Sequence, residues 1–231
     1  MTGPVALVGS GEYTTAMLEV DRWLLEGRPP RYVQIPTAAA PEGEAVLDKW
    51  IGMGLAHAES LGAQAVPLVV RDREDARDPE LVKQLEGAGL IYFSGGDPHY
   101  VVETFQDTPM WTAIVEAWRE GTALGGCSAG AMAFGGWVPS VRRPLGAGRP
   151  GLGLLAKLCV LPHFDRYFGR LPGVALKAMV RTGSGVTVVG VDEGTALVGG
   201  PDEFMVMGKS SAWVLHGSRR TPVRTGETAT F

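Results

Sequence analysis

The sequence Gly-Gly-Cys-Ser-Ala-Gly-Ala at residues 125–131 has the residue types and spacing of a nucleophile elbow. Ser128 lies between Gly126 and Gly130, with an apolar run before it and a helical stretch after it. Where a strand turns abruptly into a helix, side chains two positions before and after the central residue would collide, so both must be small. The pattern predicts an exposed Ser128 hydroxyl for attack on a carbonyl, beside helix amides that can stabilise an oxyanion.

Cys127 is a second nucleophile in the same segment. It stands one position off the centre of the turn, so we expect its side chain to point into the sheet as a small buried residue. A thiol beside the serine nevertheless keeps a cysteine-based reaction open as an alternative.

A serine nucleophile needs a base, and the chain has four histidines. His57 lies within a predicted helix far upstream and is expected at the surface. His163 follows the apolar run 158–161, His99 follows a Gly-Gly-Asp-Pro turn, and His216 begins a polar tail. Strand position favours His163, then His99, then His216 as the base.

The third member of such a site is a carboxylate that orients the imidazole. Asp192 and Glu193 both follow the predicted strand 187–191, although adjacent acids at a strand end are usually a solvated turn. Asp165 is only two residues from His163, which makes a good approach to the ring nitrogen awkward. The spacing leaves these three acids as candidates.

Two glycine-rich turns follow other predicted strands. Ser94-Gly95-Gly96-Asp97 allows backbone amides to approach a substrate oxygen closely, which suits part of an oxyanion hole. Gly9-Ser10-Gly11 suggests a dinucleotide-binding turn, but Thr14 stands where the third glycine belongs. The second strand is also followed by Pro36 and Thr37 rather than a ribose-binding acid, so we reject dinucleotide binding.

Short apolar runs alternate with helical patterns through the first 135 residues, which predicts an α/β fold with a mostly parallel central sheet and helices on both faces. Residues 136–153 read as a long loop, and short strands around one helix fill the C-terminal third. No linker divides the chain, so a single domain over residues 1–231 is expected. The expected strands are 5–8, 31–35, 65–70, 90–93, one from 123, 158–161, 187–191, 195–198, 204–207 and 213–215; the expected helices are 15–25, 42–61, 78–85, 100–105, 110–119 and 174–180.

Composition excludes several classes of protein. The 231 residues are 45% hydrophobic and carry a formal net charge of −4, which argues against a disordered chain and against a basic nucleic-acid binder. Two cysteines are too few for a disulfide framework or a Cys-rich zinc site. No stretch approaches the roughly 20 apolar residues of a membrane span, and the N-terminus lacks a signal-peptide pattern, so a cytoplasmic protein is expected.

Four segments together resemble the serine peptidase family that contains aspartyl dipeptidase (peptidase E) and cyanophycinase. They are residues 91–97, 126–131, 161–164 and 190–196, and their order fits over about the first 215 residues. The resemblance implies a fold like that of class I glutamine amidotransferases, a flavodoxin-like three-layer sandwich. It also implies a catalytic triad of Ser128, His163 and Glu193.

The resemblance implies further site residues. Backbone amides near Gly96 and Ala129 would form the oxyanion hole, with Gly95 and Asp97 beside the substrate. The family needs no metal or organic cofactor, and the expected partner is a small peptide, bound by a monomer or homodimer.

The departures from the family pattern concern substrate choice. Pro98 and Pro162 stand where cyanophycinase-like members carry glutamines, and Arg166 and Arg170 only partly match their arginine cluster. These two arginines are candidates for contact with an anionic substrate; Lys177 and Arg181 are expected on a solvated helix face.

The sequence therefore predicts a serine hydrolase that cleaves a small peptide or isopeptide through an acyl-enzyme on Ser128. One alternative is a glutamine amidotransferase-like protein that uses Cys127. The other is a non-catalytic relative that binds a small molecule.

Overall fold

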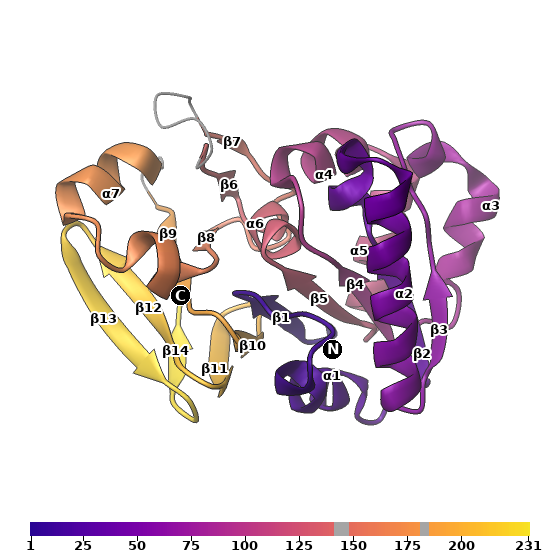
Figure 1. The fold of residues 1–231 in the computed structure, drawn as a ribbon, viewed down its shortest axis with the longest axis horizontal. Helices are drawn as coiled ribbons and strands as arrows, with labels where there is room; N and C mark the ends of the chain where they lie inside the picture. Colours follow the sequence, from indigo (N-terminus) through magenta and orange to yellow (C-terminus); the bar gives the residue numbers. More distant parts are fainter. Residues whose placement is uncertain (141–147, 181–184) are drawn as a thin grey trace.

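The main sheet has eight strands in the order β14-β11-β10-β1-β5-β4-β2-β3 (Figure 1). The computed structural model describes residues 1–140, 148–180 and 185–231. The five strands from β1 to β3 in this order run parallel, and β10, β11 and β14 pair antiparallel at the other side. The strands are β1 (Val5–Val8), β2 (Arg31–Ile35), β3 (Gln64–Pro67), β4 (Leu90–Phe93), β5 (Ala123–Cys127), β10 (Thr195–Gly199), β11 (Glu203–Gly208) and β14 (Thr228–Thr230).

A second sheet of four strands has the order β13-β12-β9-β8. Its strands are β8 (Leu158–Leu161), β9 (Thr187–Val191), β12 (Ser211–His216) and β13 (Arg219–Arg224). Strands β8 and β9 run parallel, so their carboxyl ends lie together. In Figure 1 the yellow strands β12 and β13 lie at the end of the molecule opposite to β2 and β3. A short ribbon pairs β6 (Trp137–Val138) with β7 (Arg149–Pro150).

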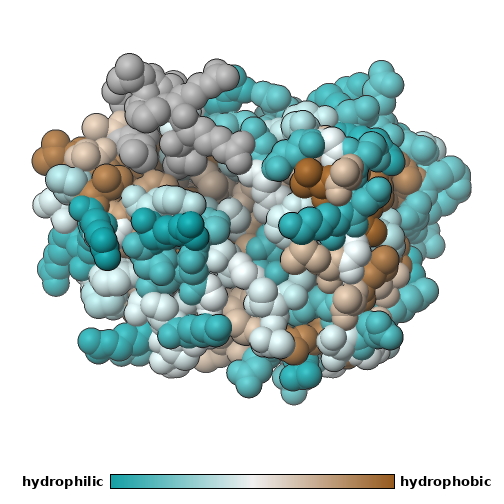
Figure 2. Space-filling model, in the orientation of Figure 1, coloured by the Kyte–Doolittle hydropathy of each residue, from teal (hydrophilic) through white to brown (hydrophobic). Residues whose placement is uncertain are grey.

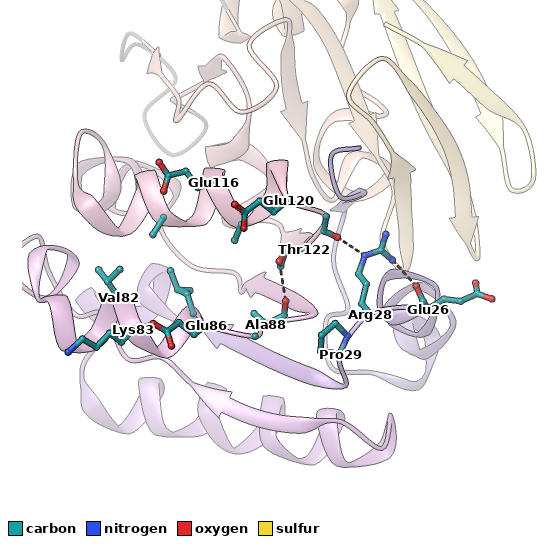
Figure 3. Close-up of a pocket in the computed structure, with 16 residues that line it drawn as sticks. Glu26, Arg28, Pro29, Val82, Lys83, Glu86, Ala88, Glu116, Glu120 and Thr122 are labelled. Carbon is teal, nitrogen blue, oxygen red and sulfur yellow. Dashed lines mark hydrogen bonds between the residues drawn. The ribbon is translucent and has the colours of Figure 1, made fainter.

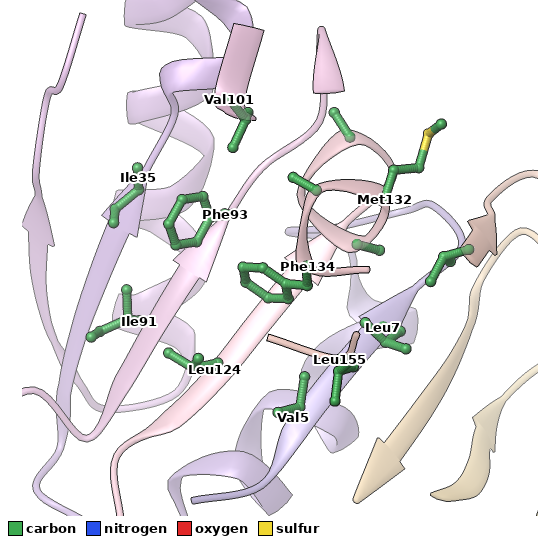
Figure 4. Packing of buried hydrophobic residues seen from close by; sticks show 14 of the residues in the cluster. Val5, Leu7, Ile35, Ile91, Phe93, Val101, Leu124, Met132, Phe134 and Leu155 are labelled. Carbon is green, nitrogen blue, oxygen red and sulfur yellow. The ribbon is translucent and has the colours of Figure 1, made fainter. Parts of the chain in front are cut away.

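Alternating side chains of the main sheet supply two cores. Val5 and Leu7 of β1 pack on the face covered by α3 to α6 (Figure 4). Ala6 and Val8 pack on the face covered by α1 and α2. A third cluster lies between the second sheet and α7. The α-helices are α1 (Leu18–Leu25), α2 (Glu44–Ser60), α3 (Pro79–Val82), α4 (Pro98–Phe105), α5 (Pro109–Arg119), α6 (Ala129–Phe134) and α7 (Gly173–Val180).

Shorter helical turns complete the connections. They are η1 (Thr15–Met17), η2 (Thr37–Glu42), η3 (Asp75–Arg77), η4 (Lys83–Leu85) and the π-helical turn η5 (Phe164–Phe168). Helices α3, α4 and α5 each begin with a proline after a capping side chain, which is Asp78, Asp97 or Thr108. Each cap accepts a hydrogen bond from an amide of the first turn, and the proline fixes a helical φ, so these helices start sharply. Helix α4 therefore begins at the end of the Gly95-Gly96 turn.

The predicted fold class is confirmed, with helices on both faces of a mostly parallel sheet. The predicted strands 5–8, 31–35, 90–93, 158–161 and 187–191 coincide with β1, β2, β4, β8 and β9. The predicted strand 65–70 is wrong at its end, because β3 stops at Pro67.

Two predictions about the C-terminal half need correction. The predicted polar tail after His216 instead forms β13 and β14. Strand β13 lies at the edge of the four-stranded sheet and pairs with β12. An edge strand tolerates Pro222 and the exposed Arg219 and Arg224. The predicted loop 136–153 contains β6 and β7, and its residues 141–147 lie outside the described residues.

Hydrophilic residues cover much of the face seen in Figure 2, and the hydrophobic residues form separate groups on it. Among the residues that the structure describes, no helix has the length and apolar character needed to cross a membrane.

Candidate active site

Ser128 occupies a strained turn between β5 and α6. Its φ is 48° and its ψ is −103°, a conformation that non-glycine residues rarely adopt. A Cβ atom on Gly126 would lie 2.7 Å from the backbone carbon of Gly130, and one on Gly130 would lie 2.5 Å from the carbonyl oxygen of Phe93. Both positions therefore require glycine, as expected for a nucleophile elbow.

Ser128, His163 and Glu193 form a continuous hydrogen-bonded chain. The Ser128 Oγ lies 3.2 Å from His163 Nε2, and His163 Nδ1 lies 2.7 Å from Glu193 Oε1. His163 follows β8 and Glu193 follows β9, whose parallel pairing brings their ends together. The His163 amide also donates to the Gly9 carbonyl at 3.2 Å, which ties the end of β8 to the end of β1. The topology thus brings one side chain from each of three strand ends to one place.

The charge on Glu193 is stabilised in this arrangement. The hydrogen bond with His163 lowers the pKa of Glu193 from its ordinary value, and the charges of His163 and Arg166 act in the same direction against partial burial. Arg166 Nη1 lies 3.5 Å from Glu193 Oε1. An ionised carboxylate favours the imidazole tautomer with its proton on Nδ1. The Nε2 lone pair then faces the Ser128 hydroxyl.

Acidic residues near Glu193 have structural partners. Asp165 Oδ1 accepts a hydrogen bond from the Glu193 amide at 3.0 Å. Asp192 is buried, and it accepts hydrogen bonds from Ser210 Oγ at 2.7 Å and Trp213 Nε1 at 2.9 Å. The interpretation of the Asp192-Glu193 pair as a solvated turn is therefore wrong for Asp192, which anchors β12 to the end of β9. Of the three acids considered, only Glu193 contacts the imidazole.

The second sheet holds the segment that carries His163. The Arg220 guanidinium of β13 lies 5.7 Å from the ring centroid of Phe164 and donates to the carbonyl oxygens of Gly169 and Leu171. A Cβ atom on Gly190 would lie 2.4 Å from the Phe164 ring, so the glycine lets this ring pack on β9. His163 itself has a left-handed backbone with φ 48° and ψ 40°. The packing of Phe164 and Arg220 holds the chain in this conformation.

The Ser94-Gly95-Gly96-Asp97 turn lies beside the elbow. Gly96 has a φ of +144°, and a Cβ atom there would lie 2.1 Å from the Ala38 carbonyl oxygen, so the turn requires glycine. The Gly95 amide donates to Glu12 Oε1 at 2.9 Å, and Asp97 Oδ1 caps α4. The two residues expected beside the substrate thus have partners within the fold. Within the described residues, the Gly96 amide has no hydrogen-bond partner.

Cys127 points away from Ser128 into the core beneath the sheet, as predicted. Its side chain is fully buried, and its Sγ lies 2.7 Å from Glu12 Oε2. Burial raises the pKa of Cys127 well above its ordinary value, and the nearby Glu12 charge raises it further. The thiolate is the reactive form of cysteine, so these surroundings make Cys127 a poor nucleophile.

The other predicted histidines lie elsewhere. The prediction that His57 is a surface residue is wrong: it is buried, and its Nε2 lies 2.7 Å from Asp21 Oδ2. His216 lies at the end of β12 and His99 in the first turn of α4. Within the described residues, neither makes a hydrogen bond to Ser128.

The predicted cationic residues lie around the segment after His163. Arg166 and Arg170 are exposed, and so is Lys177 on α7. Arg181 lies outside the described residues. Tyr167, which the sequence analysis did not single out, has an exposed ring 5.6 Å from the His163 ring.

Glu12 is the principal site residue that the sequence analysis missed. It follows the Gly9-Ser10-Gly11 turn at the carboxyl end of β1, next to the end of β5 in the sheet. This position after a strand could have identified Glu12 from the sequence, because the carboxyl ends of parallel strands meet at one edge of a sheet. The sequence analysis considered the Gly9-Ser10-Gly11 turn for dinucleotide binding alone.

A hollow of about 840 Å³ lies at the opposite edge of the main sheet (Figure 3). Its walls include residues 26–29, 86–88 and 120–122, which lead into β2, β4 and β5. Arg28 Nε donates to the Gly121 carbonyl at 2.8 Å and Thr122 Oγ1 to the Ala88 carbonyl at 3.1 Å, so these loops are joined to one another. Residues 128, 163 and 193 are not part of this hollow. Among the described residues, no three His, Cys, Asp or Glu side chains are grouped to hold a metal ion.

The fold and the Ser-His-carboxylate chain at an elbow define an α/β protein with the site architecture of a serine hydrolase. The sequence profile of peptidase family S51 matches residues 5–206. The chain therefore belongs to peptidase family S51, and the predicted family resemblance is confirmed.

Similar proteins agree with this assignment. The structure of a peptidase from an acI-B1 actinobacterium is 38% identical, with a TM-score of 0.89, and the match covers 100% of this chain and 98% of that one. A putative peptidase E from Listeria monocytogenes shares the fold at 16% identity, with a TM-score of 0.60 over 98% of this chain and 100% of that chain. A cyanophycinase from Nostoc sp. is 28% identical over 207 residues, which are 84% of this chain. The match spans 66% of that relative's length, just under two thirds.

Proposed function

We propose that the protein is a serine-type peptidase that hydrolyses a small peptide or isopeptide through an acyl-enzyme on Ser128. The observation that carries the proposal is the hydrogen-bonded chain from Ser128 through His163 to Glu193. The chain ends at a serine whose strained turn presents its hydroxyl at the carboxyl edge of the sheet. Family membership supports the same reaction class.

In the first half of the reaction, Ser128 Oγ attacks the scissile carbonyl while His163 Nε2 takes the hydroxyl proton. The carbonyl oxygen becomes an oxyanion, for which the amides of Ala129 and Gly96 are the proposed donors. Ala129 is the first residue of α6, so its amide has no intrahelical partner. As the tetrahedral intermediate collapses, the carbon–nitrogen bond breaks and His163 gives its proton to the leaving amine.

In the second half, a water molecule replaces the amine. His163 Nε2 takes a proton from this water, whose oxygen attacks the acyl carbon, and the same two amides stabilise the oxyanion. The acyl–oxygen bond to Ser128 then breaks, and His163 returns the proton to Ser128 Oγ. Glu193 stays ionised throughout and stabilises the imidazolium that forms twice in the cycle.

We further propose that the substrate carries an acidic group near the scissile bond. Arg166 and Arg170 are exposed on the segment after His163, and the resemblance to the family of aspartyl dipeptidase and cyanophycinase supports an aspartyl-containing substrate. Arg166 also contacts Glu193, so Arg170 is the cation of the two that a substrate carboxylate would meet without competition from that residue.

A hydrolysis screen tests the proposal directly. Wild-type protein and the Ser128→Ala variant would be incubated with α-aspartyl, β-aspartyl and neutral dipeptides and with glutamine, and the products identified by mass spectrometry. We expect cleavage by the wild type and a loss of about 10⁴-fold or more in the variant, as for other triad nucleophiles. Cleavage that survives Ser128→Ala would refute the mechanism.

Cys127→Ala is the matched control for the alternative nucleophile. Because Cys127 is buried and its thiol contacts Glu12, we expect this variant to keep serine-dependent cleavage. Glutamine turnover lost on Cys127→Ala and retained in Ser128→Ala would instead identify an amidotransferase-like protein. Ligand-induced thermal stabilisation without turnover would identify a non-catalytic binder.

A further inference from the structure

Glu12 is a buried carboxylate at the candidate active site with no part in the reaction proposed above. It follows β1, and only 7% of its surface is exposed. One carboxylate oxygen accepts the Gly95 amide at 2.9 Å, and the other lies 2.7 Å from Cys127 Sγ. Burying a carboxylate is costly unless hydrogen bonds compensate, so this residue needs an explanation.

The carboxylate spans three neighbouring strand ends. In the main sheet β5 lies between β1 and β4. Glu12 reaches from the end of β1, contacts the last residue of β5, and ends at the turn that follows β4. A Cβ atom on Gly95 would lie 2.9 Å from Glu12 Oε1 and 3.6 Å from the Ser128 Cβ. The carboxylate is therefore packed against the wall of the turn that faces the nucleophile.

The backbone around Glu12 is built to direct it inward. Gly11 has a φ of +86° and Tyr13 a φ of 62°, so both neighbours are left-handed. Thr14 Oγ1 donates to the Gly11 carbonyl at 2.6 Å, which closes the turn. A non-glycine residue such as Tyr13 holds this conformation only when its surroundings enforce it.

We propose that Glu12 is a positioning residue that fixes the oxyanion-binding turn by holding the Gly95 amide. This inference rests on the proposed function. Because the Gly95 amide is directed at Glu12, the Gly96 amide is the one of these two glycine amides that can join the Ala129 amide at the reacting carbonyl oxygen. The same carboxylate accepts a hydrogen bond from the Cys127 thiol, which stays protonated behind the serine.

The geometry favours a carboxylate over an apolar residue of similar size. The two carboxylate oxygens reach two strand ends at once, which an apolar side chain cannot do. Without the Glu12 oxygens the Gly95 amide would be a buried donor that lacks an acceptor, and the turn could relax toward another conformation. An oxyanion hole stabilises charge because its donors are already in place. Small rotations of this turn would therefore lower the rate of the chemical step.

Labelling with a fluorophosphonate probe tests this without a known substrate. The dependence of the labelling rate on probe concentration gives kinact, for the chemical step, and KI, for binding. Wild type would be compared with Glu12→Ala, Glu12→Gln and the control Asp21→Asn, which alters another buried carboxylate away from the turn. Intact mass and the Ser128→Ala variant would establish that labelling is on Ser128.

We expect Glu12→Ala to lower kinact by about 10- to 100-fold with little change in KI, somewhat less than the loss of a whole oxyanion donor. Glu12→Gln retains an oxygen for the Gly95 amide and is expected to restore kinact to within about threefold of the wild type. Asp21→Asn should leave kinact within about twofold, whatever its effect on Tm.

Three outcomes would overturn the inference: wild-type kinact in Glu12→Ala, an equal loss in Glu12→Gln, or an effect confined to KI. If the wild type is not labelled at Ser128 at all, the proposed function fails instead. Should Glu12→Ala not fold, amide exchange in the wild type decides the structural part. A Gly95 amide proton that exchanges as fast as an open loop would contradict the hydrogen bond.

Discussion

The chain contains two histidine–carboxylate pairs with the same contact distance and different surroundings. His163 Nδ1 lies 2.7 Å from Glu193, and His57 Nε2 lies 2.7 Å from Asp21. The first pair is at the carboxyl edge of the sheet, with side chains 27% and 36% exposed. The second is 2% and 0% exposed, between α1, α2 and the sheet.

The surroundings shift the pKa values of the two carboxylates in opposite directions. The hydrogen bond with His163 lowers the pKa of Glu193, whereas burial raises the pKa of Asp21 against the opposing hydrogen bond from His57. The outer pair therefore holds a stable negative charge next to a ring that can exchange protons with solvent. The inner pair has Tyr32 as its further neighbour, whose hydroxyl lies 3.4 Å from Asp21.

Both pairs have a contact of 2.7 Å, so the contact distance does not distinguish the proposed catalytic pair from the buried one. What distinguishes the outer pair is that its second ring nitrogen faces a serine hydroxyl in a strained turn. The inner pair joins two helices to one face of the sheet. We therefore expect the outer pair to determine activity and the inner pair to determine stability.

Histidine truncation should separate the two pairs most strongly. His163→Ala removes the base, and we expect kcat to fall by about 10⁴- to 10⁶-fold, with little change in Tm because the ring is partly exposed. His57→Ala removes a buried ring and its hydrogen bond to Asp21, and should cost about 3 kcal/mol of unfolding free energy. Activity assays at 25 °C and urea unfolding measure the two effects.

The same two substitutions would also show whether the roles of the two pairs are reversed. A His57→Ala protein that folds at the assay temperature but has lost activity to the same extent as His163→Ala would show that the inner pair takes part in the reaction. Equal stability losses in both variants would show that the outer pair also holds the fold together.

The next largest effect is expected from neutralising the outer carboxylate. Glu193→Gln keeps the size of the side chain, removes its charge and no longer enforces the productive tautomer, so kcat should fall by about 10²- to 10⁴-fold. Steady-state kinetics of the wild type and the variant measure this loss. A kcat that falls by less than tenfold would contradict the role of Glu193 in the reaction.

Much of this site was predictable because it depends on local patterns. The glycines around Ser128 are required by sterics that act within five residues, and apolar runs mark the strands that end at Ser128, His163 and Glu193. The position of a residue at a strand end then limits where its side chain can lie.

The inner pair and Glu12 were not predictable in the same way. Asp21 and His57 are 36 residues apart, and neither breaks the pattern of its helix, so only the packing of α1 beside α2 shows that they meet. Glu12 contacts Gly95 and Cys127, which are 83 and 115 residues away. Strand β13 was missed because its polar edge lacks the apolar run that marks a buried strand.

A smaller effect is expected in the pH dependence of stability. Burial raises the Asp21 pKa from 3.8, so the folded protein keeps this proton over a pH range where the unfolded chain releases it. The associated stability is present below 3.8 and is lost as the pH rises through the folded-state pKa. The Asp21→Asn variant has no carboxyl group to titrate at this position. The wild type should therefore lose stability relative to the variant as the pH rises from 3.8 through the folded-state pKa of Asp21.

Urea unfolding at a series of pH values measures that difference. In a His57→Leu background the side chain at position 57 cannot donate a hydrogen bond to Asp21. The loss should then extend to higher pH, because the hydrogen bond from His57 holds the Asp21 pKa down. A wild type that gains stability relative to Asp21→Asn over the same window would show that the inner pair is a well-compensated ion pair.

The smallest effect should come from the residue that supports the outer carboxylate. Asp165 accepts the Glu193 amide at 3.0 Å, near the protein surface, so Asp165→Ala removes one restraint on Glu193 without touching the imidazole. We expect kcat to fall by about three- to tenfold with KM unchanged, the size of one partly exposed charge-assisted hydrogen bond. Asp165→Asn keeps an acceptor oxygen and should remain near wild type. If instead both variants raise KM at constant kcat, Asp165 belongs to the substrate-binding surface. The inner pair is supported by the buried Tyr32 hydroxyl instead, so the measurement shows how far the outer pair depends on groups that solvent can reach.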